Sequence, residues 1–212
     1  MPADGAPKFR RRKAERPAEI LAAAMAVFAE RGFAGARLED VAARAGVSKG
    51  AIYLYFATKE EVFRAVVDQS LAPDIEAVKA MAAAHQGPFP DLLRLLVGRM
   101  VGLVAHTPVG GVAKMVIGEA RNFPELARVW HDRLVSQAVE ALTLAVAAAQ
   151  ARGEVRAGDP RLFALQIVAP LLIGVIWRET FTPIGAPDVD IEALAAQHLD
   201  TLLDGLMLRK AA

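Results

Sequence analysis

The sequence predicts an all-α fold of about nine helices without a sheet. Hydrophobic residues make up 54% of the 212 residues but aromatic residues only 6%, so alanine, leucine and valine supply the excess. Alanine and leucine are among the least costly residues in a helix interior. Apolar residues also recur at helical spacing between glycine and proline breaks, and no segment alternates convincingly as a strand does.

The first two helices are delimited by proline and glycine. Pro17 suits the first turn of a helix, which is expected to end at Arg31 with Gly32 as its left-handed cap. A second, short helix is expected at residues 38–45 and stops at Gly46. These two helices open a predicted N-terminal unit.

Two capping signals predict the next helices. Ser48 is the expected N-cap of a third helix, residues 48–56. Thr58 caps a fourth, and Glu61 at its third position completes a capping box. This fourth helix is expected to run to about residue 81, although Pro73 should bend it or start a new segment.

Five further helices are expected in the rest of the chain. Asp159 and Pro160 supply an N-cap followed by a first-turn proline for one of them. The expected ranges are 91–106, about 112–122, 124–152, 160–181 and 191–208.

Composition excludes several kinds of chemistry. The chain has no cysteine, so disulfides, zinc–thiolate sites and cysteine nucleophiles are excluded. Its four histidines lack metal-ligand spacing, and it contains no P-loop, no G-x-G-x-x-G and no G-x-S-x-G. We therefore expect no enzyme activity, no catalytic or metal site and no cofactor.

Charge is distributed unevenly although the net charge is +1. Residues 1–60 carry 11 basic and 7 acidic residues, and the remainder carries 14 and 17. A basic head on an acidic body suggests that the head meets a polyanion. The segment 1–16 is interpreted as a flexible basic arm, which either follows DNA in the minor groove or along the backbone or is a solvated tail.

Targeting and membrane signals are weak. The pair Arg10 and Arg11 is not followed by the apolar region of a twin-arginine signal. The most apolar segment, residues 162–177, has sixteen residues, fewer than the ~20 that cross a bilayer. We interpret it as a helix buried between other helices or subunits, and we expect a cytoplasmic protein that does not engage a membrane.

Residues 38–56 match the requirements of a helix-turn-helix. Small Ala42 allows the two helices to approach closely, and Gly46 supplies the left-handed turn residue. The spacing predicts one buried face made of Val41, Ala45, Val47, Ile52 and Tyr55. A plain helical hairpin is the alternative interpretation of the same turn.

The second helix of such a unit lies in the major groove of DNA, with its N-terminal residues at base edges. Lys49 suits guanine or a phosphate, and Tyr53 suits a base or a thymine methyl. The alternative interpretations are a solvated lysine at 49 and a packed side chain at Tyr53. Tyr55 and Lys59 are placed for phosphates. The base-facing candidates are Ser48, Lys49, Gly50, Ala51 and Tyr53.

Residues 18–66 resemble the DNA-binding domain of TetR/AcrR-type transcriptional regulators. The matching elements are Gly32-Phe33, Asp40-Val41-Ala42, Ala45-Gly46-Val47-Ser48-Lys49-Gly50, Tyr53-Leu54-Tyr55-Phe56 and Lys59-Glu60-Glu61. Where that family often has a capping Thr or Ser, this chain has Ala36 and Arg37, so the cap is lost and Arg37 is expected to replace the phosphate contact. The stretch 117–126 also looks like the C-terminal domain of one subgroup.

The resemblance implies a homodimer that binds a palindromic DNA operator, usually as a repressor, and is released by a small-molecule effector. It divides the chain into an arm at 1–16, a DNA-binding domain at 17–62 and a ligand-binding and dimerisation domain at 63–212. The last two helices carry broad apolar faces that suit a four-helix bundle across a dimer axis, or else an intramolecular core. These faces comprise Leu165, Val168, Leu172, Ile176, Leu194, His198, Leu202 and Leu206.

The effector pocket is expected between helices of the second domain. Its candidates have an apolar bias, which favours a lipophilic or aromatic effector. Effector binding is expected to swing the helix that starts at Thr58, because this helix joins the two domains. A helical interaction adaptor without sequence-specific DNA binding is the alternative function. The pocket candidates are Met100, His106, Met115, Phe123, Trp130, Trp177 and Phe181.

Overall fold

The computed structural model describes residues 8–208, with side chains from residue 17 onward. It is helical throughout, and its only β pairing within those residues is an isolated bridge between Val155 and Met207. The all-α prediction is therefore confirmed. The α-helices are α1 Lys8–Gly35, α2 Leu38–Arg44, α3 Lys49–Ile52, α4 Lys59–Val66, α5 Ala72–Ala84, α6 Phe89–His106, α7 Val109–Glu119, α8 Pro124–Trp130, α9 Ser136–Ala151, α10 Pro160–Thr180 and α11 Ile191–Leu206.

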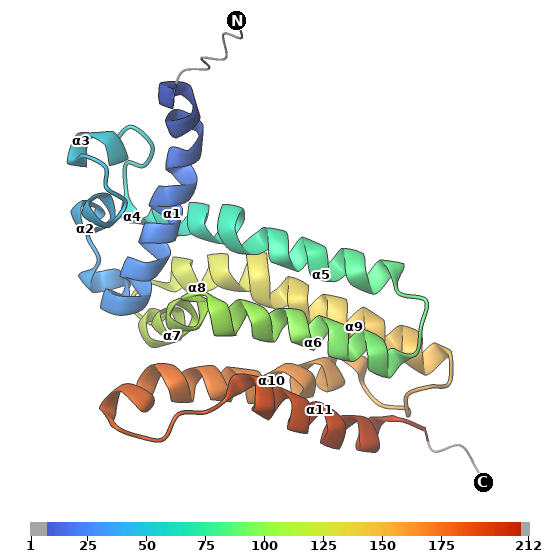
Figure 1. Ribbon diagram of the computed structural model, residues 1–212. Coiled ribbons are helices and arrows are strands. Elements are labelled where there is room, and N and C mark those ends of the chain that lie inside the picture. The colour runs from blue at the N-terminus through green and yellow to red at the C-terminus, as the bar shows by residue number, and fades with distance from the viewer. Residues whose placement is uncertain (1–7, 209–212) are drawn as a thin grey trace, which may run out of the picture.

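The molecule has a head at one end of a long bundle (Figure 1). The head contains α1 to α4, with α1 standing crosswise to the long helices. Helices α5, α6 and α9 run along the bundle, and α10 and α11 form a layer beneath them.

Helix α1 begins earlier than the sequence suggested. It starts at Lys8 rather than at Pro17, so the proline lies inside the helix. Arg, Lys and Ala are good helix formers, and an internal proline removes one backbone hydrogen bond without necessarily ending the helix. Part of the predicted arm is therefore helical. The side chains of residues 8–16 and all of residues 1–7 lie outside the described residues.

Two predicted helices contain π-helical turns. The helix after Thr58 runs through a turn at Val67–Leu71, where the N–H of Ala72 donates to the Val67 carbonyl, so Pro73 enters without breaking it. A second turn, His131–Val135, joins α8 to α9. The two turns contact each other, and Arg133 Nε lies 3.4 Å from Asp68 Oδ1. The predicted bend at Pro73 thus takes the form of a π-turn.

Two hydrophobic clusters form the core, and their boundary differs from the predicted domain boundary. The first joins buried residues of α1 to α4 with residues of α7 and α8, including Val112, Met115 and Leu126. The second joins α5, α6, α9, α10 and α11. The head therefore shares its apolar core with the near end of the bundle.

Candidate nucleic-acid interface

The turn between α2 and α3 has the geometry that the sequence predicted. Gly46 has φ +66°, in the left-handed region that favours glycine, and the N–H of Val47 donates to the Ala42 carbonyl at 3.0 Å. Ala42 and Ile52 are 2% and 0% exposed. Small size at 42 and conformational freedom at 46 thus set the crossing of the two helices.

Helix α3 is capped as predicted but is shorter. Ser48 Oγ accepts a hydrogen bond from the N–H of Ala51 at 3.2 Å. Regular α-helix ends at Ile52 rather than at residue 56, and the chain continues in turns, with the N–H of Phe56 donating to the Ile52 carbonyl at 3.0 Å. The capped end is the part of a recognition helix that meets base edges.

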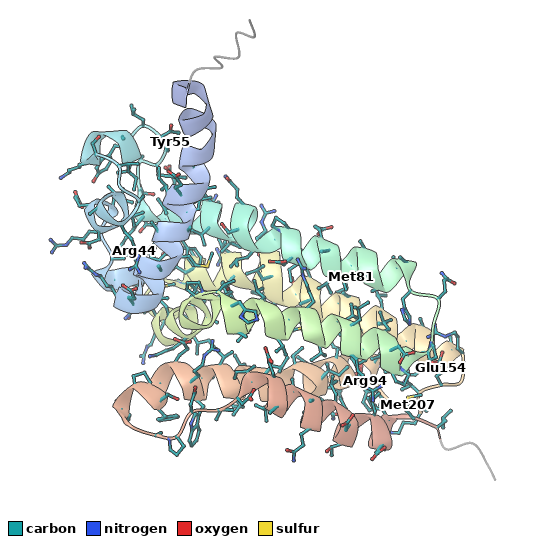
Figure 2. The ribbon with its side chains drawn as sticks, in the orientation of Figure 1. Arg44, Tyr55, Met81, Arg94, Glu154 and Met207 are labelled. Carbon is teal, nitrogen blue, oxygen red and sulfur yellow. The ribbon has the colours of Figure 1, made fainter. Side chains whose placement is uncertain are left out.

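The outer face of α3 exposes the residues expected to meet DNA. Ser48, Lys49 and Gly50 are exposed, and Ala51 is half-buried. Tyr53 is 46% exposed, and Tyr55, labelled in Figure 2, is 37% exposed. The prediction that Tyr55 helps to bury the inner face is wrong, because the chain leaves the helix at Ile52 and turns this side chain outward.

Leu54 was missed by sequence reasoning. It is 84% exposed and lies in the chain between Tyr53 and Tyr55, both of which are exposed too. An apolar side chain this exposed is informative because it gains nothing from water. The signal in the sequence was its position inside a Tyr-Leu-Tyr-Phe run of which only Phe56 packs against the core.

Glu39 on α2 holds the polar side chains of α3. Its Oε1 lies 2.7 Å from Lys49 Nζ, and Tyr53 Oη donates to the same oxygen at 3.4 Å. Hydrogen bonding with Lys49 lowers the pKa of Glu39 below 4.5, and the same contact raises the pKa of Lys49 above 10.5. The pair is exposed, so both groups stay charged at neutral pH and Lys49 is presented beside a carboxylate.

Ion pairs tie α2 to the end of α1. Arg44 Nη1 lies 2.6 Å from Glu30 Oε2, and Arg31 Nη1 lies 2.7 Å from Asp40 Oδ2. Figure 2 shows Arg44 on the outer side of the head. Arg37, at the start of α2, is exposed and makes no side-chain cap. The predicted loss of the cap is thus confirmed.

The start of α4 is capped as predicted, with a shift of one residue. The N–H of Glu61 donates to Thr58 Oγ1 at 3.2 Å, and Glu61 Oε2 accepts from the N–H of Ala57 at 2.7 Å. Lys59, predicted to contact phosphate, points elsewhere. Its Nζ donates to the Phe33 carbonyl at 2.8 Å and lies 4.5 Å from the centre of the Phe33 ring. Its ammonium group is therefore engaged with the end of α1.

The seven predicted pocket residues do not gather around one cavity. Met115, Phe123 and Trp130 pack in the first hydrophobic cluster. Met100 packs against the second cluster. His106, Trp177 and Phe181 are exposed, and the last two rings meet edge to face with their centres 5.2 Å apart. None of these seven side chains lines the pockets described for the structure, so their assignment to an effector site stays a prediction.

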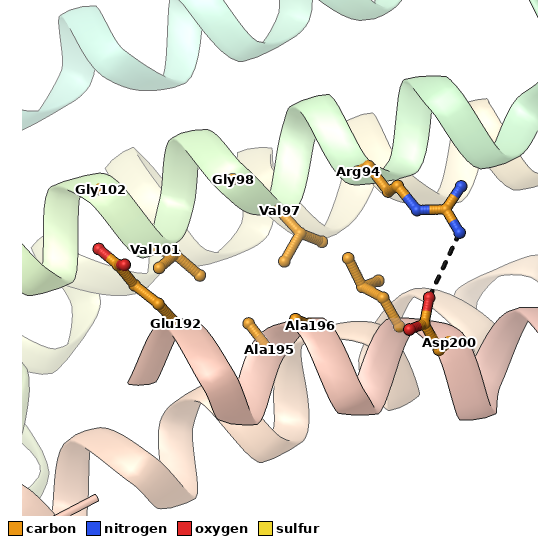
Figure 3. Close-up of a pocket in the computed structure, with 10 residues that line it drawn as sticks. Arg94, Val97, Gly98, Val101, Gly102, Glu192, Ala195, Ala196 and Asp200 are labelled. Carbon is orange, nitrogen blue, oxygen red and sulfur yellow. Dashed lines mark hydrogen bonds and ion pairs between the residues drawn. The ribbon is translucent and has the colours of Figure 1, made fainter. Parts of the chain in front are cut away.

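A groove of about 480 Å³ lies instead between α6 and α11. Figure 3 shows its apolar floor, and an ion pair between Arg94 and Asp200 closes one end at 3.3 Å. Glu192 lies at the other end. The floor comprises Val97, Gly98, Val101, Gly102, Ala195, Ala196 and Leu199.

The predicted dimer residues divide by helix face. Leu165 and Leu172 are 42% and 44% exposed. Leu206 is 1% exposed in the second cluster, so its assignment to a dimer face is wrong; it packs against the core of its own chain. The half-buried members are Val168, Ile176, Leu194, His198 and Leu202.

Comparison with known sequences identifies the family. Residues 20–66 match the model of bacterial regulatory proteins, tetR family, and residues 91–205 match that of the AefR-like transcriptional repressor, C-terminal domain. The chain belongs to the tetR family. The second match covers more than half of the chain, so the family assignment includes the bundle as well as the head.

Family relatives agree with this assignment. The HTH-type transcriptional repressor BepR of Brucella suis biovar 1 is 30% identical over 168 residues, which cover 77% of this chain and 79% of BepR. The uncharacterized HTH-type transcriptional regulator YfiR of Bacillus subtilis is 38% identical over 80 residues, only 38% of each chain. The tetR family is thus one of transcriptional regulators, not of enzymes.

A solved structure shows the same fold. The transcriptional regulator FadR from Bacillus subtilis, determined in complex with stearoyl-CoA, superimposes with a TM-score of 0.74 at 23% identity. The superposition covers 89% of this chain and 98% of FadR. Head and bundle together therefore have the tetR-family architecture.

Two helical stretches are long and apolar enough to cross a membrane by length and composition. They are Pro124–Ala151 and Pro160–Ile184, and the bent pair Phe89–His106 and Val109–Glu119 qualifies if taken as one span. The length argument made from residues 162–177 is therefore wrong, because α10 has 21 residues. One face of α10 nevertheless packs in the second cluster, through residues such as Phe163 and Ile167.

Proposed function

We propose that this chain is a transcriptional repressor that binds a palindromic operator as a homodimer and is released by a small apolar or aromatic effector. The observation that carries the proposal is the outer face of α3, where a Ser48-capped helix end displays Lys49 and Tyr53 above a fully buried Ile52. A rigid helix with exposed donors at its N-terminal end suits the major groove.

The contacts divide by what each side chain can recognise. Lys49 and Tyr53 are assigned to base edges, and Leu54 to a thymine methyl or a sugar. Tyr55 and Arg37 are assigned to phosphates, which position the domain without selecting a sequence. Ser48, Gly50 and Ala51 are assigned to close approach because they are small, and the space beside Gly50 is open, with no heavy atom within 4 Å of a Cβ built there.

The dimer is assigned to the outer face of α10. Leu162 and Ile173 on this face are 57% and 62% exposed, in addition to Leu165 and Leu172. Large apolar side chains exposed together on one helix favour a partner surface, and an isologous two-fold contact would bury this face on both copies. The same symmetry would place two recognition helices about 34–36 Å apart on a palindrome.

The groove between α6 and α11 is the site we assign to the effector. Its volume of about 480 Å³ lies in the usual range for small-molecule sites. Its floor of valine, alanine and leucine favours an apolar ligand. Effector binding releases DNA only if the state with displaced recognition helices binds the effector more tightly. The helix that begins at Thr58 joins both domains and is assigned to this motion.

The test is operator selection with the purified chain, followed by a mobility shift at several salt concentrations. Sequence-specific binding of one dimer per palindrome is expected. Binding that ignores sequence, or no binding at low salt, would leave the interaction-adaptor function instead. Sedimentation with and without vesicles distinguishes a cytoplasmic dimer from a membrane-bound chain. The dimer stays in the supernatant, whereas a membrane-bound chain sediments with the vesicles.

The effector assignment is tested by thermal-shift screening of apolar and polar compounds. Apolar compounds are expected to stabilise the wild type. Ala196→Trp is expected to fill the groove and abolish this shift, because Ala196 lines the groove and is exposed. Stabilisation by sugars or metal ions alone would contradict the assignment.

A further inference from the structure

Helix α1 kinks at Gly32, and the segment from this kink to Arg37, which leads into α2 and is called the α1–α2 turn below, is held by a carboxylate from the bundle. Glu119, the last residue of α7, accepts a hydrogen bond from the N–H of Phe33 at 2.7 Å and one from the N–H of Ala34 at 2.8 Å. One oxygen serves each donor, so the carboxylate spans two successive peptide groups. Hydrogen bonds with an ionised partner are shorter and stronger than neutral ones.

The same turn is held from its other side by α4. Lys59 Nζ donates to the carbonyls of Phe33 and Ala34 at 2.8 Å and 3.4 Å. The ammonium also lies 4.5 Å from the Phe33 ring centre and 5.9 Å from that of Phe123, which follows α7. An anion from one domain thus binds the N–H groups of two residues while a cation from the other binds their carbonyls.

The backbone at residue 32 is shaped for this contact. Gly32 has φ +71°, and a Cβ built there would lie 2.5 Å from Glu119 Oε1. A side chain at this position would therefore be strained and would also displace the carboxylate. The missing side chain at Gly32 therefore leaves the space that the Glu119 carboxylate occupies, although the two residues are 87 positions apart in sequence.

Short links connect this turn to the recognition helix. Helix α2 begins at Leu38, directly after the turn, and Glu39 on α2 bonds Lys49 of α3. At the other end, α7 meets α10, since Lys114 Nζ donates to the Glu179 carbonyl at 2.5 Å. Helix α7 therefore touches both the helix assigned to the dimer and the turn that leads to the DNA-reading face.

We propose that Glu119 is a positioning residue that fixes the orientation of the helix-turn-helix relative to the bundle. This inference rests on the proposed function for its consequence on DNA, but not for its geometry. This connection between bundle and head is separate from the one through α4. It runs from α7 through the Glu119 carboxylate to the backbone of Phe33 and Ala34. Loss of the carboxylate leaves the recognition helices of a dimer without a fixed separation, so both half-sites are no longer engaged together.

The geometric arm of the test measures the head-to-bundle distance by double electron–electron resonance. The chain has no cysteine, so Ala43→Cys on α2 and Glu140→Cys on α9, both exposed, give one labelled pair. Labelled protein is diluted with unlabelled protein to isolate distances within one chain. Glu119→Ala is expected to broaden the distance distribution, and Glu119→Gln to broaden it less because one amide oxygen still accepts.

The control is Glu125→Gln, which makes the same chemical change at an exposed position six residues away on α8. It is expected to leave the distribution unchanged. Hydrogen exchange supplies a local readout, since the amides of Phe33 and Ala34 should lose protection in Glu119→Ala. If this variant fails to fold, Glu119→Gln decides the question by the same two measurements.

The functional arm measures binding to the selected operator. Glu119→Ala is expected to weaken it about tenfold, the equivalent of one charge-assisted hydrogen bond, while Glu125→Gln binds as the wild type does. Unchanged distances, protection and affinity in both Glu119 variants would overturn the inference. If wild type itself binds no DNA, the proposed function fails, and the distance and exchange measurements still decide the role of Glu119.

Discussion

The α2–α3 region and the second hydrophobic cluster are built from contacts of different range. In the head, Ser48 bonds Ala51 and Glu39 bonds Lys49, partners three and ten positions apart. In the bundle, Arg94 pairs with Asp200, 106 positions away. Short-range contacts leave a pattern in the sequence, whereas long-range contacts exist only once the helices are packed. The caps and the turn of the head were therefore predictable residue by residue, and the bundle only as a set of helices.

The largest expected effect is where α7 of the bundle packs against α1 of the head. A Cβ at Gly111 on α7 would lie 2.6 Å from the Cβ of Ala29 on α1. Gly111→Leu is therefore expected to destabilise the fold by about 3 kcal/mol through overpacking. The matched control is Gly118→Ala on the same helix, where no atom lies within 4 Å, and where alanine is expected to add up to about 1 kcal/mol. Urea unfolding measures both, and equal free energies would show that α1 and α7 are not tightly packed.

The second prediction tests the DNA-reading face. Tyr53→Ala is expected to weaken binding to the selected operator by about 1–3 kcal/mol and to affect a scrambled duplex little. Tyr53→Phe keeps the ring but removes the hydroxyl that donates to Glu39, so it separates base contact from the link to α2. Fluorescence anisotropy at one salt concentration measures both duplexes. Equal losses on both would assign Tyr53 to general binding.

The third prediction concerns a long-range contact of the bundle. Glu154 Oε2 accepts from the N–H of Phe89 at 2.6 Å, at the start of α6, and Oε1 lies 2.5 Å from Arg152 Nε. The Phe89 N–H, and secondarily Arg152, lower the pKa of Glu154 below 4.5. Its contribution to stability is therefore present above pH 4.5 and is lost as pH falls through the lowered pKa.

Glu154→Gln is accordingly expected to cost about 1–2 kcal/mol of unfolding free energy at pH 7 and progressively less at acidic pH. Glu125→Gln, on an exposed carboxylate, serves as the control with no such difference. Denaturant unfolding between pH 7 and pH 3 measures this. A constant difference between Glu154→Gln and wild type across that range would contradict the assignment.

The smallest expected effect separates two basic residues of the head. Arg37→Ala is expected to reduce the salt dependence of DNA binding by about one phosphate contact. Lys59→Gln is expected to leave that slope unchanged, because the Lys59 ammonium bonds the Phe33 carbonyl. Binding titrations across a salt series give both slopes. A reduced slope for Lys59→Gln would restore its predicted phosphate contact.

The differences between prediction and structure have identifiable physical causes. Helix α3 ends at Ile52 because the chain turns outward there, a choice that local propensity did not show. The pocket candidates were chosen for their apolar character, but Met115 and Phe123 pack in the first hydrophobic cluster with residues of the head. Periodicity marks an apolar face, and only the neighbouring helix decides whether that face becomes core, cavity or exposed surface.

The sequence by itself determined the helical class, the caps at Ser48 and Thr58, the left-handed turn at Gly46 and the family of the head. These features depend on backbone conformation and on neighbours within a few residues. Tertiary structure alone decided that the first core joins head and bundle, and that Lys59 and Glu119 bind opposite sides of one turn. Those contacts join distant segments, so they depend on how the helices pack, which no local pattern encodes.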